Sequence, residues 1–202
     1  MAEMNRVARF FVNRSAARRA ARAYDWIRRE VPVPHAARCL EIGCGHGDLA
    51  VRIVEGFRPA QYVATDLDSL QVETARRAVA KRYPSGLPPA LILRTADMLH
   101  LPFDDASFDV VFAVVALHHA GRSHHDPTGI PGALSEIDRV LRPGGLVVYQ
   151  EFLHKELIRK WFTGHGFSID QVRRRRRHES VVVSKSGTSS VPVPSPEGLP
   201  GP

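Results

Sequence analysis

The chain has 202 residues, 44% of them hydrophobic, so it can bury one core but is too short for two ordinary domains with a linker. Its formal net charge is +7, its apolar runs fall short of the roughly 20 residues that cross a bilayer, and it opens without a signal peptide. Two cysteines, Cys39 and Cys44, exclude a disulfide framework or a four-cysteine zinc site and suit a cytoplasmic protein.

The amino-terminal segment, residues 5–30, is rich in Ala and Arg and has apolar residues spaced at three and four, which predicts an amphipathic helix. We expect residues 1–34 to form a helical cap or lid over the rest of the chain. Its arginines would face an anionic acceptor or a membrane surface, and its aromatic residues an apolar acceptor pocket. Docking on the core is the favoured alternative for the two phenylalanines. The arginines concerned are Arg14, Arg18, Arg19 and Arg22, and the aromatic residues are Phe10, Phe11, Tyr24 and Trp26.

Strand and helix segments alternate through residues 35–186. This alternation predicts a single α/β domain, with a doubly wound, mostly parallel sheet and helices on both faces. The last two strands are close enough in sequence to form an antiparallel hairpin at one sheet edge. Residues 187–202, rich in Ser, Pro and Gly, are expected to form a disordered tail. The expected strands are 38–42, 62–65, 90–95, 108–115, 146–150, 167–173 and 180–184, and the later helices 49–56, 70–83, 132–141 and 155–164.

Three glycines, Gly43, Gly45 and Gly47, follow the first strand, and Glu41 lies two residues before them. Glycines let the backbone turn tightly and approach a ligand closely. The first strand-to-helix turn of an open parallel sheet is the usual ligand crevice. Dinucleotide-binding oxidoreductases also use a glycine loop, but their fingerprint requires the third glycine at position 48, which is Asp here.

A carboxylate, Asp66, ends the second expected strand, with Asp68 two residues further on. Asp66 could accept hydrogen bonds from both hydroxyls of a ribose. Alternatively, Asp66 or Asp68 caps the helix that begins near Leu70. Together with the glycine loop, the ribose role is favoured for Asp66.

With these residues and three later motifs, the chain resembles the class I (seven-strand, Rossmann-like) S-adenosylmethionine-dependent methyltransferases. Within that class it is similar to the small-molecule group of ubiquinone and menaquinone biosynthesis methyltransferases. The likeness covers residues 39–184. The later motifs are Ala96-Asp97-Met98 with residues 101–109, Leu117-His118-His119, and Leu141-Arg142-Pro143-Gly144-Gly145, a turn before the fifth strand.

The resemblance implies S-adenosylmethionine as the methyl donor and S-adenosylhomocysteine as the product. It assigns the methionine end to Glu41, the glycine backbone and the chain around Val114, and the ribose to Asp66. It assigns an adenine face to Leu67, and the adenine edge to Asp97 and Met98, although Asp97 has a competing role in a turn. The implied donor-binding residues are Glu41, Gly43, Gly45, Gly47, Asp66, Leu67, Asp97, Met98 and Val114.

Methyl transfer from a sulfonium is an in-line displacement, which the protein assists by aligning the acceptor and excluding water. A phenol, alcohol or ammonium acceptor must also lose a proton, and His119, ahead of His118, is the candidate general base. His124, His125 and Asp126 contain metal-binding groups, but their spacing matches no known site, so we expect no metal. We expect the cover of the acceptor to come from residues 5–30 and 118–132.

The expected acceptor is a small molecule, aromatic or lipid-like, with peripheral membrane contact left open. One alternative is a nucleic-acid methyltransferase that uses the basic segments. It is not favoured, because the loop after the fourth strand lacks the Asn/Asp-Pro-Pro-aromatic signature, and blunting of a sheet edge explains the arginines of residues 173–177 better. A second alternative is a non-catalytic, donor-binding partner subunit. The acceptor's identity and the oligomeric state are not determined by these patterns.

Overall fold

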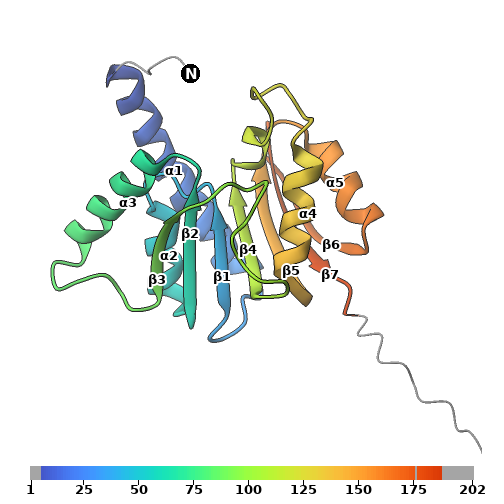
Figure 1. The fold of residues 1–202 in the computed structure, drawn as a ribbon, viewed down its shortest axis with the longest axis horizontal. Coiled ribbons are helices and arrows are strands. Elements are labelled where there is room, and N and C mark those ends of the chain that lie inside the picture. The colour runs from blue at the N-terminus through green and yellow to red at the C-terminus, as the bar shows by residue number, and fades with distance from the viewer. Residues whose placement is uncertain (1–5, 176, 188–202) are drawn as a thin grey trace, which may run out of the picture.

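A computed structural model describes residues 6–175 and 177–187, which fold around one seven-stranded sheet (Figure 1). The tail predicted to be disordered lies, beyond Gly187, outside the described residues. None of the helices in the described part has the length and hydropathy needed to span a membrane. The elements are α1 (Arg6–Glu30), β1 (Arg38–Ile42), α2 (Asp48–Phe57), β2 (Gln61–Asp66), α3 (Ser69–Arg82), β3 (Leu91–Thr95), β4 (Phe108–Val114), the 3-10 turn η1 (Leu117–His119), α4 (Ile130–Val140), β5 (Leu141–Glu151), α5 (Lys155–Gly164), β6 (Phe167–Arg175) and β7 (His178–Lys185).

The strand order is β3-β2-β1-β4-β5-β7-β6. Strands β1 to β5 pair in parallel, while β7 pairs antiparallel with both β5 and β6. The predicted doubly wound sheet with an antiparallel edge hairpin is therefore confirmed. The strand order reverses direction between β1 and β4, and a ligand crevice is expected at the carboxyl ends of strands at such a point.

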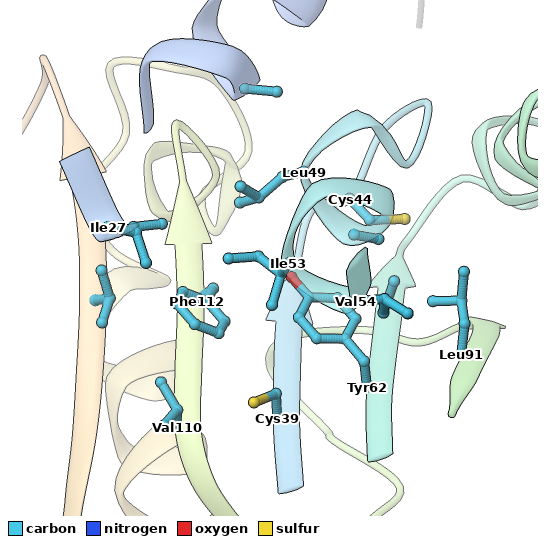
Figure 2. Packing of buried hydrophobic residues seen from close by; sticks show 14 of the residues in the cluster. Ile27, Cys39, Cys44, Leu49, Ile53, Val54, Tyr62, Leu91, Val110 and Phe112 are labelled. Atoms are coloured by element: carbon cyan, nitrogen blue, oxygen red, sulfur yellow. The ribbon is translucent and has the colours of Figure 1, made fainter. Parts of the chain in front are cut away.

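Both faces of the central strands are buried, which explains their nearly continuous apolar runs. On one face, α1, α2 and α3 pack over residues such as Tyr62 and Phe112, and Figure 2 shows Ile27 and Ile53 among them. On the other face, α4 and α5 pack over the alternate residues of the same strands, such as Val111. The period-two alternation along β4 thus assigns successive side chains to two separate cores.

The carboxyl-terminal half of α1 packs into the core. Trp26 and Ile27 are almost completely buried against the sheet. Tyr24 packs over Gly56 of α2 and edge-to-face on Phe57, with ring centroids 6.1 Å apart. The expectation that Tyr24 and Trp26 line an acceptor pocket is therefore wrong, because both anchor the helix. The side chains of Phe10, Phe11 and Arg14 lie outside the described residues.

The turn predicted at Arg142–Gly145 is enclosed within β5. Leu141 pairs with Phe108, and the register then shifts so that Leu146 pairs with Val110. The intervening residues bulge from the strand, with Gly144 at φ +74°. The predicted turn therefore lies inside β5, which begins at Leu141, five residues earlier than the predicted strand.

Residues 173–175 of the basic segment lie on β6, which is one of the two edge strands of the sheet. Arg174 and Arg175 are exposed, and the Arg174 Nε lies 3.3 Å from Oε2 of the buried Glu179. Arg176 lies outside the described residues. Charged side chains on an edge strand hinder its pairing with another chain, as predicted for this segment.

Candidate functional site

A cleft of about 900 Å³ opens at the carboxyl ends of β1, β2 and β4, where the strand order reverses. Its volume is near the upper end of the range of about 300 to 1,000 Å³ that small-molecule pockets have. Part of its wall comes from α1, and part from the loop after η1, so the two segments predicted to cover the site do line it. These segments supply Ala16, Arg19, Ala20, Gly121, Arg122, Ser123 and His124.

The glycine loop after β1 forms the floor of the cleft. Gly43 has φ +72°, and a Cβ there would lie 2.6 Å from the Cβ of Ala116, so the loop packs directly on the chain that follows β4. Gly45 has φ +51° and faces the cleft, and apart from its own chain neighbours no atom of the described residues lies within 4 Å of the position of a Cβ. Gly47 precedes α2 and packs against Ala75 of α3, outside the cleft lining.

The two carboxylates after β2 have separate roles. The Gly45 N–H donates to Oδ2 of Asp66 at 2.9 Å, and the Asp68 N–H donates to Oδ1 of Asp66 at 3.1 Å. Asp68 is the N-cap of α3 and accepts a hydrogen bond from the Leu70 N–H at 2.8 Å. The capping role therefore belongs to Asp68, while Asp66 is oriented at the cleft wall by the glycine loop.

Glu41 is almost fully buried beneath the loop, with one side in the cleft. The Tyr62 hydroxyl donates to its Oε2 at 2.9 Å. Burial raises the pKa of Glu41 to about 8, and the negative charges of Asp66 and Asp48 add to this effect, which the Tyr62 hydrogen bond opposes. A cationic group of a ligand close to Glu41 would favour its charged form.

Of the three residues predicted to contact adenine, two line the cleft and one does not. Leu67 and Met98 both line the cleft, and Leu67 is 62% exposed, which leaves an apolar surface for a flat ring. Asp97 is not part of the lining. Its Oδ1 accepts a hydrogen bond from the Leu99 N–H at 2.9 Å, which is the competing turn role.

The chain after β4 forms the opposite wall, through Val114, Val115 and Ala116. Val115 has φ +58°, a conformation that β-branched residues rarely adopt, and its N–H donates to the Gln150 carbonyl at 2.7 Å. Strain of this kind persists only where surrounding contacts impose it. The amino-acid pattern contains no signal for it, because valine is ordinary at the end of a strand.

Two histidines follow this wall in η1. His118 is buried, and its Nδ1 lies 2.9 Å from Oε2 of the buried Glu151. His119 lines the cleft, as does His124 further along the loop. Desolvation, together with His118 and His124, lowers the pKa of His119 to about 4. Glu151 was not among the sequence candidates, because nothing local marks a partner 33 residues away.

The structure therefore brings most of the predicted donor-binding residues to one cleft. Gly47 and Asp97 lie outside its lining, and His119 lies at the end formed by the loop after η1. The residues that do line it are Glu41, Gly43, Gly45, Asp66, Leu67, Met98 and Val114.

Comparisons with known proteins agree with this geometry. A family model described as a methyltransferase domain matches residues 40–149. The chain is 33% identical over 132 residues to 27-O-demethylrifamycin SV methyltransferase of Amycolatopsis mediterranei (strain S699), which covers 65% of this chain and 44% of that protein. It is 35% identical over 114 residues to 2-phytyl-1,4-naphtoquinone methyltransferase of Nostoc punctiforme (strain ATCC 29133 / PCC 73102), which covers 56% and 45%. The chain spans about half the length of the curated relatives it matches.

Solved structures share the fold at low sequence identity. The [4+2]-cyclase SpnF superposes with a TM-score of 0.69 at 18% identity, over 82% of this chain and 80% of that one. A SAM-dependent methyltransferase from Aquifex aeolicus superposes with a TM-score of 0.65 at 15% identity, over 80% and 88%. With the family match over more than half of its residues, the chain belongs to the methyltransferase-domain family, among the class I, Rossmann-like S-adenosylmethionine-dependent methyltransferases.

Proposed function

We propose that this chain transfers a methyl group from S-adenosylmethionine to a small, aromatic or lipid-like acceptor. The observation that carries the proposal is the hydrogen bond from the Gly45 N–H to Asp66, which joins the glycine loop and the predicted ribose acceptor within the large cleft. The relatives support the acceptor class: their names include a rifamycin, a naphthoquinone and a fatty-acid O-methyltransferase.

The residues in the cleft fit the three chemical parts of the donor. Asp66 offers carboxylate oxygens to ribose hydroxyls, and the exposed surfaces of Leu67 and Met98 offer apolar contact to an adenine ring. Glu41 offers a buried carboxylate to the methionine ammonium. The side of Gly45 that lacks a Cβ leaves room for close approach to the backbone. Asp97 would contribute only if its side chain left the turn.

When bound, S-adenosylmethionine supplies an electrophilic methyl group on its sulfonium. The chain's own task is to align the acceptor with this group and to exclude water. The segments that can do so are α1, through Ala16 and Arg19, and the loop from Gly121 to His124. We propose that His119 contacts the acceptor.

The alternatives have less support. Strand β6, with its arginines, is separated from β4 by β5 and β7, and none of its residues lines the cleft, so these arginines give no direct support for a nucleic-acid acceptor at the donor site. SpnF shares this fold and is named as a cyclase, so the fold by itself does not imply methyl transfer. A cytoplasmic location stays a prediction, supported by the free, buried state of Cys39 and Cys44.

The test is calorimetric titration with S-adenosylmethionine and S-adenosylhomocysteine, on the unmodified chain and on Asp66→Ala. We expect micromolar binding that Asp66→Ala weakens by about 10- to 100-fold, because hydrogen bonds to a charged group contribute about 1.5–3 kcal/mol. Asp68→Asn is the matched control, since asparagine preserves the helix cap and the affinity should change little.

Absence of binding to folded protein would refute the proposal. If binding is observed, the acceptor screen uses donor carrying an isotopic methyl label and covers phenols, quinols and fatty acids. Donor binding without transfer to any acceptor class would favour the non-catalytic partner subunit.

A further inference from the structure

Three histidines converge beside the cleft, at the end away from Asp66. We define His118, His119 and His124 as the histidine cluster: one ring nitrogen from each lies within 4.8 Å of those of the other two. The ring centroids are 4.1 Å apart for His118 and His119, 4.4 Å for His119 and His124, and 5.3 Å for His118 and His124. We propose that the histidine cluster binds a divalent transition metal of the zinc type.

The first argument is the buried partner of His118. Glu151, at the end of β5, is completely buried and accepts hydrogen bonds from the Leu117 N–H at 2.8 Å and, when His118 Nδ1 is protonated, from His118 at 2.9 Å. This arrangement directs the lone pair to Nε2 of His118. Metal-binding histidines almost always donate their second ring nitrogen to a carboxylate or carbonyl in this way. A cation on His118 would also offset the charge of the buried Glu151.

The second argument is that hydrogen bonds fix the loop that carries His124. The Asp126 carboxylate accepts hydrogen bonds from the Arg122 N–H at 2.9 Å and from Thr128, whose N–H lies at 3.0 Å. His154, before α5, lies with its Nε2 3.1 Å from the His124 carbonyl oxygen. The backbone at His124 is therefore held in place from both sides, and its imidazole needs only side-chain rotation to adjust.

The separations between the ring nitrogens are close to those of a metal site. Zn–N bonds of about 2.0–2.1 Å in a tetrahedron place the nitrogens about 3.3 Å apart. The separations of up to 4.8 Å in the histidine cluster exceed this by roughly 1.5 Å. His119 and His124 are exposed, so rotations about their side-chain bonds can close the difference while His118 stays fixed by Glu151.

The ligand set indicates the class of metal. Imidazole suits Zn²⁺, Cu²⁺, Ni²⁺ and Fe²⁺, whereas Mg²⁺ and Ca²⁺ prefer oxygen. Three protein ligands leave a fourth tetrahedral position, which is typical of zinc sites that bind an exogenous ligand. Because His119 and His124 line the cleft, that position can meet an oxygen atom of the acceptor.

This site differs from the candidates in the sequence. The pattern pointed to His124, His125 and Asp126, for which no metal was expected. In the structure Asp126 is used within its loop, His125 is absent from the cluster, and His118 and His119 take part instead. A ring nitrogen of His119 that binds a metal cannot accept the acceptor's proton as well, so the proposal replaces the general-base role expected for His119.

The experiment titrates tag-free, chelator-treated full chain with Zn²⁺, Co²⁺ and Mg²⁺ by calorimetry, and records the visible spectrum of the Co²⁺ form. We expect one equivalent of Zn²⁺ and of Co²⁺ to bind, with the intense absorption of tetrahedral cobalt, and no Mg²⁺ to bind. His119→Ala and His124→Ala should each weaken Zn²⁺ binding at least tenfold. The neighbouring, exposed His125→Ala is the matched control and should leave the affinity unchanged.

Glu151→Gln probes the second layer of the site and should weaken Zn²⁺ binding by about 10- to 100-fold. Circular dichroism and urea unfolding verify that this variant is folded, and the exposed His119 and His124 variants carry the test if it is not. The proposal is overturned if no metal binds, if binding persists in the His119→Ala/His124→Ala double variant, or if His125→Ala weakens binding equally. The titration contains no methyl donor, so its failure is distinct from failure of the proposed methyl transfer.

Discussion

The two ends of the cleft are constructed in different ways. At the end proposed for the donor, Glu41, the glycine loop and Asp66 belong to one strand-loop-helix-strand unit, and the hydrogen bond that closes it joins Gly45 to Asp66, 21 residues away. At the end proposed for the acceptor, His118 depends on Glu151 from β5, and the His124 carbonyl lies against His154, just before α5. The first arrangement is formed by one continuous segment, so it can recur with the same ligand in many proteins. The second depends on contacts between separate segments, so it can differ from one acceptor to another.

The largest expected effect on stability is at the contact between the glycine loop and the chain that follows β4. Gly43→Ala forces an alanine into φ +72° and places its Cβ 2.6 Å from Ala116. The left-handed conformation costs about 1–2 kcal/mol and overpacking about 1–3 kcal/mol, so we expect a loss of about 2–5 kcal/mol in the free energy of unfolding, measured in urea. Adding Ala116→Gly should recover the overpacking part. Equal stability of the single and double variants would show that the contact between the loop and the chain after β4 is unimportant.

A smaller loss is expected at the end of the cleft proposed for the acceptor. Glu151→Ala leaves the buried Leu117 N–H and His118 ring without their partner, which costs about 1–3 kcal/mol for each unsatisfied group. The two groups together would cost about 2–6 kcal/mol, but Glu151→Ala also removes the cost of burying the carboxylate itself. We therefore expect the free energy of unfolding to fall by about 2–3 kcal/mol, and by less in Glu151→Gln, whose amide can still make hydrogen bonds. Similar stability of the two variants would contradict this assignment.

Glu41 should make stability depend on pH. Its pKa is raised from 4.5 in the unfolded chain to about 8 in the fold, so the folded state holds the proton more tightly. Its contribution is fully present below pH 4.5 and is lost as pH rises through 8. Urea unfolding at several pH values measures it, and Glu41→Gln should flatten the profile relative to the unmodified chain.

Donor binding gives an independent check on Glu41. A methionine ammonium close to the carboxylate would lower its pKa, so binding at pH 7 should release protons. Calorimetry in buffers of different ionisation enthalpy detects this release. Its persistence in Glu41→Gln would assign the protons to another group.

The smallest effect is expected for Asp97. Because its carboxylate accepts a hydrogen bond from the Leu99 N–H and does not line the cleft, Asp97→Ala should weaken donor binding less than threefold. The change in free energy of unfolding should be below about 1 kcal/mol, as for loss of one turn hydrogen bond. A tenfold loss of donor affinity would instead support the adenine contact that the family resemblance implied for Asp97.

The pattern of residues predicted the seven strands and the edge hairpin, because apolar periodicity and loop composition are local properties. It also placed the glycine loop beside Asp66, since adjacent parallel strands end at the same edge of the sheet. It misassigned Tyr24 and Trp26, because an amphipathic helix does not reveal which of its aromatic residues faces the core and which a ligand. It left Asp66 and Asp68 both available for the cap of α3.

The sequence alone thus determined the class of fold and the set of donor-binding candidates, both encoded in short segments with fixed spacing. Only the tertiary structure decided that Asp68 caps α3, that Asp97 stabilises a turn, and that His118 is held by Glu151. The physical reason is the range of the interactions. Backbone conformation and burial periodicity act within a few residues, whereas the partner of a buried polar side chain is selected by the packing of the whole sheet.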